Sequence, residues 1–167
     1  MDIGRIVRHL GLPGWAVSRA FPPAALQAIE AAIRTGEARH RGQVRFVVEG
    51  TLDGAPLWHG QTACARAREL FGLLGVWDTA ENNGVLIYLL LADRDVEIVA
   101  DRGVHAVVGA EGWETICRRM EAAFREGRYE AGALDGLQAV NDHLVRTFPA
   151  TGASRANELP DQPLVLR

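Results

Sequence analysis

The sequence predicts an α/β fold, a three-layer α/β/α sandwich with a small mixed sheet. Helical and strand patterns alternate along the chain, which is typical of a sheet covered by helices. Residues 85–91 (VLIYLLL) are apolar or aromatic at every position, as expected of a central strand that helices cover on both faces. A tight turn at Asp93 and Arg94 then leads into a second strand at residues 96–100, so the two strands form an antiparallel hairpin.

The composition fits one globular domain. The chain has 167 residues, of which 48% are hydrophobic and 23% are charged, so a core of ordinary size can form. The formal net charge is -3, whereas a general nucleic-acid binder would carry a basic excess. We expect residues 1–21 to be an N-terminal helical extension, residues 22–148 the α/β/α domain and residues 149–167 a mobile C-terminal tail without periodicity.

The N-terminal segment has the pattern of a short amphipathic helix over residues 3–10. Its apolar face carries Ile3, Ile6, Val7 and Leu10, and its polar face carries Arg5, Arg8 and His9. Two interpretations stay open: the helix packs on its own domain, or it docks on a protein partner or, weakly, on an anionic membrane surface. The basic residues interrupt what would be the apolar core of a secretory signal, and no apolar run could span a bilayer. We therefore expect a cytoplasmic protein.

The elements before the hairpin follow from their patterns. Residues 22–38 predict a helix that begins at a proline pair and carries apolar residues at helical spacing. Residues 43–49 (QVRFVVE) alternate and are rich in β-branched side chains, which indicates a strand. A turn-rich connection over residues 51–56 then leads to a helix at residues 62–76.

The elements after the hairpin are an irregular segment and two helices. We expect residues 102–109 to be irregular. Residues 111–126 predict a helix with one apolar stripe, and Gly127 ends it, since glycine suits the position after a helix. Residues 129–148 predict the last helix.

Four motifs in the same order resemble those of the TPM domain family. The longest, at residues 82–98, has an Asn-Asn-Gly-Val-Leu entry, an apolar strand, an acidic-Arg turn and a second strand. Upstream, residues 36–48 resemble the first helix-to-strand passage, and residues 67–71 with Trp77 resemble the second helix and its following loop. Downstream, residues 124–129 resemble the family's Phe-x-x-Gly-x-Tyr link.

The resemblance covers about residues 22–148 and implies an α/β/α sandwich. Plant and bacterial members are described as metal-binding, chiefly calcium, and as weak acid phosphatases, so it implies Ca or Mg as a cofactor. The chain is similar to a short, intracellular bacterial branch. Where the family usually has Gly-x-Gly-Leu-Glu after the second strand, residues 100–105 read Ala-Asp-Arg-Gly-Val-His, so one glycine and the acidic residue are missing.

Residues that suit a hard cation gather at one end of the predicted sheet. The loop before the central strand supplies Asp78, Glu81, Asn82 and Asn83, and Asp101 ends the neighbouring strand. Because the two strands run antiparallel, the end of one lies beside the start of the other, so Asp101 and the loop should be close. Calcium and magnesium bind to such carboxylate and amide oxygens. The alternative is that the Asn-Asn-Gly sequence serves a turn and that Asp78 caps one.

Three residues at the same end could support phosphoester hydrolysis. That reaction needs a nucleophile or a metal-activated water, together with cations for the phosphoryl oxygens, and Asp101, Arg102 and His105 could fill these roles. The alternative is a structural or exposed histidine, and no P-loop, Cys-x5-Arg loop or Asp-x-Asp pair accompanies the three. Since no catalytic set is complete, the sequence favours a non-catalytic binding or regulatory module. A metal-assisted phosphoester hydrolase and a calcium-binding domain are the alternatives.

Overall fold

The computed structural model describes residues 2–152 and 156–166, so the predicted tail at 153–155 and 167 lies outside it. In chain order the elements are α1 (Ile3–Gly11), α2 (Ala16–Ala20), α3 (Pro23–Glu37), β1 (Gln43–Glu49), α4 (Gly54–Trp58), α5 (Ala63–Leu73), β2 (Gly84–Leu90), β3 (Asp95–Ala100), α6 (Arg102–Arg125), α7 (Tyr129–Thr147) and β4 (Leu164–Leu166). The strand order is β3-β2-β1-β4. β1 is parallel to both of its neighbours, and β2 is antiparallel to β3, so the sheet is mixed as predicted.

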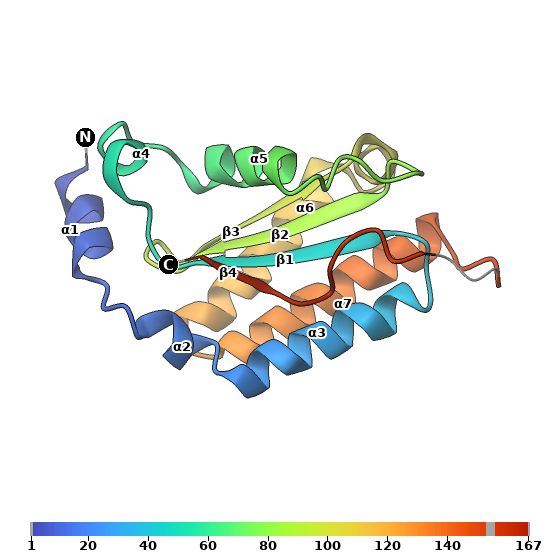
Figure 1. Ribbon diagram of the computed structural model, residues 1–167, viewed down its shortest axis with the longest axis horizontal. Coiled ribbons are helices and arrows are strands. Elements are labelled where there is room, and N and C mark those ends of the chain that lie inside the picture. Colours follow the sequence, from blue (N-terminus) through green and yellow to red (C-terminus); the bar gives the residue numbers. More distant parts are fainter. Residues whose placement is uncertain (1, 153–155, 167) are drawn as a thin grey trace.

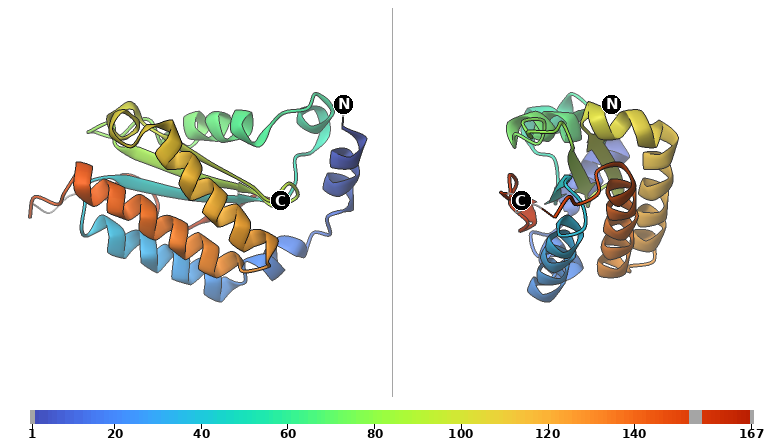
Figure 2. Two further views of the ribbon diagram at one scale, coloured as in Figure 1. Left: turned by 180° about the vertical axis from the view of Figure 1, so that it is seen from behind. Right: turned by 90° about the vertical axis from the view of Figure 1, so that its right-hand side faces the viewer.

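Helices cover both faces of this sheet. α3, α6 and α7 lie on one face and α5 lies on the other (Figures 1 and 2). Alternate side chains of β2 enter two separate cores: Ile87 and Leu89 join the core under α3, α6 and α7, whereas Leu86 and Tyr88 join the core under α5. All residues of β2 are buried, which confirms the prediction of a central strand sandwiched between helices.

The segment at 102–109 is helical, so the expectation of an irregular segment is wrong. It forms the first part of α6, and the backbone carbonyl of Asp101 accepts from the N–H groups of Val104 (3.1 Å) and His105 (2.9 Å). A φ of 74° at Gly109 separates this part from the rest of the helix. The glycines in the segment obscured its helical period in the sequence. In the structure, Val104 is buried and anchors this part of the helix on the core.

Residues 164–166 form an edge strand, which the sequence analysis did not predict within the C-terminal tail. β4 pairs with β1 in parallel, and β1 side chains also hold the chain that leads to it. Gln43 Oε1 accepts from the backbone N–H of Leu159 at 3.1 Å, and Arg45 Nη1 donates to the carbonyl of Pro160 at 2.8 Å. These partners lie more than a hundred positions apart in the sequence, which explains why no local pattern predicted the strand.

The N-terminal extension packs on the domain through α1. The side chains of Ile6 and His9 are buried, which confirms the interpretation that this helix contacts its own domain. Two further short helices were not predicted individually: α2 lies within the helical extension expected over residues 1–21, and α4 overlaps the turn-rich connection. Among the described residues, none of the helices is both long and apolar enough to cross a bilayer.

Candidate functional site

The end of β3 and the start of β2 meet as the antiparallel hairpin requires. Ala100 lies opposite Val85, and the backbone N–H of Asp101 donates to the carbonyl of Gly84 at 2.9 Å. A Cβ built on Gly103 would lie 2.7 Å from the carbonyl oxygen of Asn82. Asp101 and the Asn-Asn-Gly loop are therefore in contact, as the sequence predicted.

Several residues of that loop already have structural partners. Asn82 has a φ of 51°, the left-handed turn conformation that asparagine tolerates. Glu81 forms an ion pair with Arg41, with 2.5 Å between Oε2 and Nη1. Asp78 is exposed, and its backbone N–H donates to the carbonyl of Gly75 at 3.0 Å. Turn geometry at Asn82 and charge pairing at Glu81 account for these two residue types without a cation.

Asn83 and Asp101 differ from the other candidate residues because each has a buried oxygen without a partner among the described residues. The buried Asn83 side chain donates through Nδ2 to the carbonyl of Arg41 at 2.7 Å. Asp101 caps α6, with Oδ1 accepting from the N–H of Arg102 at 2.6 Å. Asn83 Oδ1 and Asp101 Oδ2 are buried and have no hydrogen-bond partner in the described part of the chain. Such oxygens suit a hard cation or a water, although no cluster of three or more His, Cys, Asp or Glu that could hold a metal occurs among the described residues.

The two remaining predicted residues lie in the first turn of α6. Arg102 and His105 are both exposed. His105 lines a cavity of about 380 Å³ between β3 and α6, together with Trp113 and Cys117. Burial raises the pKa of the Cys117 thiol to about 12, which disfavours the nucleophilic thiolate.

A larger cavity, of about 900 Å³, lies at the opposite end of the sheet. Its walls come from α1, α2, the β2–β3 turn and the α6–α7 connection, segments that are far apart in the sequence. Four arginines, Arg8, Arg19, Arg94 and Arg125, line it together with the aromatic rings of Trp15 and Tyr129. The sequence pattern did not indicate this site, because the arginines are spread over more than a hundred positions.

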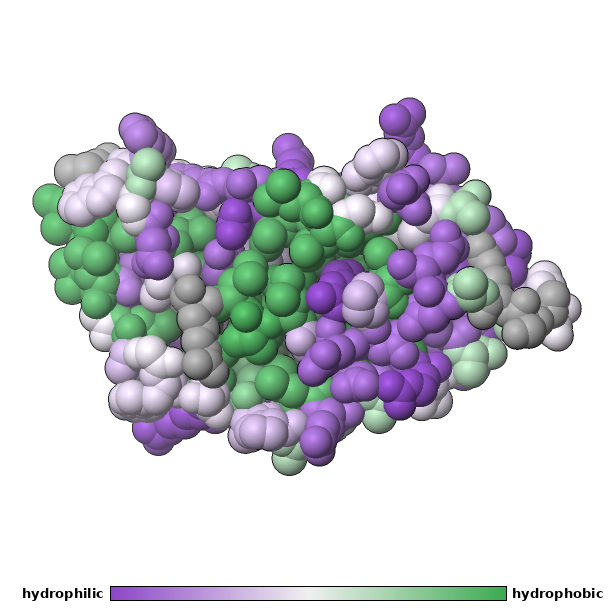
Figure 3. All heavy atoms as spheres, in the orientation of Figure 1, coloured by the Kyte–Doolittle hydropathy of each residue, from purple (hydrophilic) through white to green (hydrophobic). Residues whose placement is uncertain are grey.

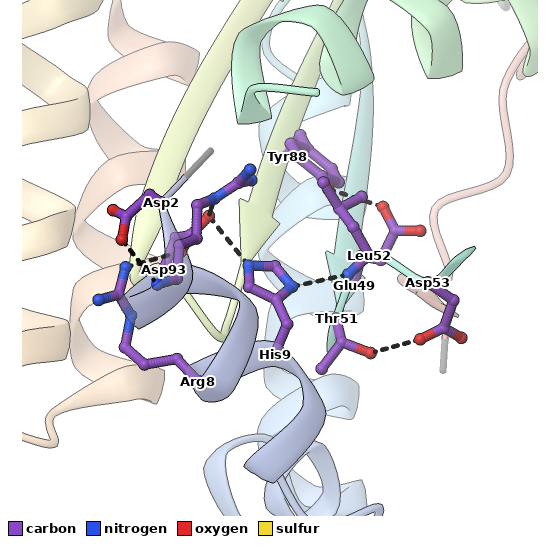
Figure 4. A network of polar contacts seen from close by, with 10 residues as sticks. Asp2, Arg8, His9, Glu49, Thr51, Leu52, Asp53, Tyr88 and Asp93 are labelled. Carbon is purple, nitrogen blue, oxygen red and sulfur yellow. Dashed lines mark hydrogen bonds and ion pairs between the residues drawn. The ribbon is translucent and has the colours of Figure 1, made fainter. Parts of the chain in front are cut away.

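Asp93 attaches α1 to the edge of this cavity (Figure 4). Its carboxylate lies 2.8 Å from Arg5 Nε and 3.4 Å from Arg8 Nη2, and its side chain is only 12% exposed. Burial alone would raise the pKa of Asp93, but the hydrogen bond from Arg5 and the close contact with His9 outweigh it and hold that pKa below its ordinary value. From the sequence, Asp93 was expected only as part of a tight turn.

His9 contributes to the same attachment through both ring nitrogens. Nδ1 accepts from the backbone N–H of Leu52 at 3.0 Å. Nε2 lies 3.2 Å from Asp93 Oδ2, a close contact whose alignment falls short of a good hydrogen bond. Since Nδ1 accepts, the proton is on Nε2 and faces the carboxylate. The inner face of α1 is thus held by polar contacts with the β2–β3 turn.

A second polar network joins α5 to the sheet. Glu49, at the end of β1, accepts from the hydroxyl of Tyr88 at 2.6 Å and from two nitrogens of Arg66 at 3.0 and 2.9 Å. Burial and the bond to Glu49 both raise the pKa of Tyr88, so this hydroxyl keeps its proton. The network fixes the position of α5 and offers no activated nucleophile.

Comparisons with known proteins identify the fold and the family of the chain. The sequence model of the TPM domain matches residues 18–143, and no curated protein matches. The NMR structure of the BA42 protein from the psychrophilic bacterium Bizionia argentinensis is 28% identical, covers 85% of this chain and 92% of its own, and superposes with a TM-score of 0.73. The N-terminal domain of a P. gingivalis protein shares the fold at 24% identity and a TM-score of 0.60, over 80% of this chain and 82% of that domain. The matched residues span most of the chain, and the chain belongs to the TPM domain family.

Proposed function

We propose that this TPM domain is a non-catalytic binding module that takes an anionic ligand in the cavity between α1 and the β2–β3 turn. The observation that supports the proposal is the set of four arginines around one cavity of about 900 Å³. Guanidinium groups bind phosphate and carboxylate oxygens through paired hydrogen bonds. The protein as a whole is acidic, with a net charge of -3, so this positive lining is a local feature rather than a consequence of composition.

Two of the four arginines are available to a ligand. Arg8 and Arg125 already face carboxylates, at 3.4 Å from Asp93 and 2.9 Å from Glu121. Arg19 and Arg94 form no ion pair with any residue that the structure describes, and the Arg19 guanidinium lies 5.6 Å from the centre of the Trp15 ring. An anion between Arg19 and Arg94 would give both a charged partner.

A thermal unfolding series with inorganic pyrophosphate tests this function. A ligand that binds the folded state raises the melting temperature with its concentration. We expect this rise in the wild type and its loss in the Arg19→Gln/Arg94→Gln double variant. Arg68→Gln, which removes the same kind of charge from the exposed face of α5, is the control and should keep the rise. A double variant that responds as the wild type does would refute the proposal.

The second candidate function is cation binding at the other end of the sheet, either for stability or for metal-assisted phosphoester hydrolysis. The buried oxygens without partners, Asn83 Oδ1 and Asp101 Oδ2, favour it. These two residues would hold Ca or Mg, which would activate water and neutralise phosphoryl oxygens when bound. Arg102 and His105 follow Asp101 by one and four positions and are exposed, so they are the candidates to contact such a substrate.

A calcium titration separates this candidate from a purely structural loop. Excess calcium should raise the melting temperature of the wild type but not of Asp101→Asn, which can still accept the N–H of Arg102 as a helix cap. An unchanged wild-type melting temperature would remove the cation. Hydrolysis of an aryl phosphate that persists in Asp101→Ala would assign that activity to a contaminant.

A further inference from the structure

One face of α1 is apolar and exposed. Ile3 is 69% exposed, Val7 63% and Leu10 68%, and these positions follow one another at helical spacing along a single stripe. Trp15, which follows α1, is 58% exposed. We call these four residues the α1 stripe. In Figure 3 hydrophobic side chains gather at the left end of the molecule, where Figure 1 shows α1.

The α1 stripe is a concentration of exposed apolar surface. Of the eight large apolar side chains that are exposed among the described residues, four belong to it, so these residues are not scattered as on an ordinary surface. The stripe also stays exposed while the helix is docked, since Ile6 and His9 face the domain instead. Attachment to Asp93 therefore orients the stripe outward.

The stripe and the arginines belong to one continuous surface. Val7 and Trp15 are members of the stripe and also line the cavity that holds Arg8, Arg19 and Arg94. Apolar side chains with a tryptophan, bordered by arginines, are the composition of helices that lie in the interface of an anionic bilayer. An acidic protein would otherwise be repelled from such a surface, and the arginines supply the local attraction that overcomes this.

We propose that the α1 stripe and the cavity dock together on a bilayer that contains anionic phospholipid. The stripe lies among the headgroups and upper acyl chains, and a headgroup phosphate lies between Arg19 and Arg94. The proposal rests on the anion-binding function proposed above and names the source of the anion. Because the stripe is short and the attraction is partly electrostatic, binding is reversible and weakens as the salt concentration rises.

Sedimentation with vesicles tests the proposal. The wild type should bind vesicles of phosphatidylcholine mixed with phosphatidylglycerol and should bind pure phosphatidylcholine vesicles at least about tenfold more weakly. Val7→Ser/Leu10→Ser should lower the affinity for the mixed vesicles by about tenfold or more, because two apolar side chains that would enter the bilayer are lost. Leu73→Ser is the matched control: Leu73 is 71% exposed on α5, outside the α1 stripe, and its change should leave binding intact.

Tryptophan fluorescence gives a second measure of contact between the α1 stripe and the bilayer. Mixed vesicles should change the tryptophan fluorescence of the wild type, and Trp15→Phe should reduce this change. The measurement reports contact with the bilayer even if the serine variant does not fold. Equal binding by the wild type and Val7→Ser/Leu10→Ser, with both folded, would overturn the proposal, as would equal binding to both kinds of vesicle. A pyrophosphate-dependent rise in melting temperature without vesicle binding would overturn this inference alone. Failure of both assays would overturn the binding function as well.

Discussion

Glu37 should make the stability of this protein depend on pH. It ends α3, and its Oε1 accepts the backbone N–H of Val44 at 2.8 Å where β1 begins. Burial raises the pKa of Glu37 from 4.5 to about 7, the hydrogen bond from Val44 lowers it, and the charge of Asp161 adds to the rise. The folded protein therefore holds this proton at pH values where the unfolded chain has released it.

The sign and size of the effect follow from this difference. Between the unfolded pKa near 4.5 and the folded pKa of about 7, the folded state binds more protons, so stability falls as pH rises through that window. The two pKa values differ by about 2.5, which at 1.36 kcal/mol for each pH unit sets an upper limit of about 3 kcal/mol. Glu37→Gln keeps an acceptor for Val44 but carries no charge. It should therefore stabilise the protein by about 1–3 kcal/mol above pH 7 and by much less near pH 4.

Urea unfolding at about pH 4 and about pH 8 measures both quantities. Glu114→Gln, which breaks an exposed ion pair with Arg118, is the control and should change stability little at either pH. An equal gain from Glu37→Gln at both pH values would refute the electrostatic origin of the effect. The reasoning would also be refuted if the stability of Glu37→Gln changed between the two pH values by as much as that of the wild type.

Three further substitutions test other contacts. Asp93→Asn should cost about 2–3 kcal/mol and speed amide exchange in α1 while β2 stays protected, because α1 loses its charged attachment; unchanged exchange in α1 would contradict this. Tyr88→Phe should lower the free energy of unfolding by about 1–2 kcal/mol, measured by urea, because a donor to Glu49 is lost. Gly84→Ala should lower it by more than about 2 kcal/mol, equally with and without calcium, because its Cβ would lie 2.0 Å from the carbonyl oxygen of Val76. A loss that calcium reverses would show that Gly84 serves the cation instead.

The sequence predicted the sheet well where the determining interactions are local. The run at residues 85–91 is apolar on both faces, which predicted a central strand. The tight turn at Asp93 and Arg94 requires the next strand to pair with it in antiparallel, which predicted the hairpin. Contact between Asp101 and the start of β2 is a consequence of the same hairpin. The family motif at residues 82–98 and the strand pattern of the same residues therefore predicted the same hairpin.

The sequence could not predict features that depend on distant partners. Asp93 contacts Arg5 across 88 positions, and the backbone N–H of Leu52 contacts His9 across 43, so neither side chain shows its role locally. β4 likewise depends on β1, which lies more than a hundred residues earlier. The arginines of the cavity become a set only when the extension folds back on the β2–β3 turn.

α1 lies outside the residues that match the TPM domain model but forms one wall of the arginine-lined cavity. The TPM domain match begins at residue 18, whereas the α1 stripe lies within residues 3–15 and Arg8 lies on the same helix. The matched part contributes Arg19, Arg94, Arg125 and Asp93 to the cavity, and α1 contributes Val7 and Arg8 from outside the match. The wall that α1 supplies is held in place by the contacts of Asp93 with Arg5 and His9. Anion binding in this cavity should therefore depend on Asp93 even though its own charge opposes the ligand, because without it the wall that α1 supplies is lost. Weaker pyrophosphate binding in Asp93→Asn, against the simple expectation that removing a negative charge strengthens it, would support this order of effects, and stronger binding would contradict it.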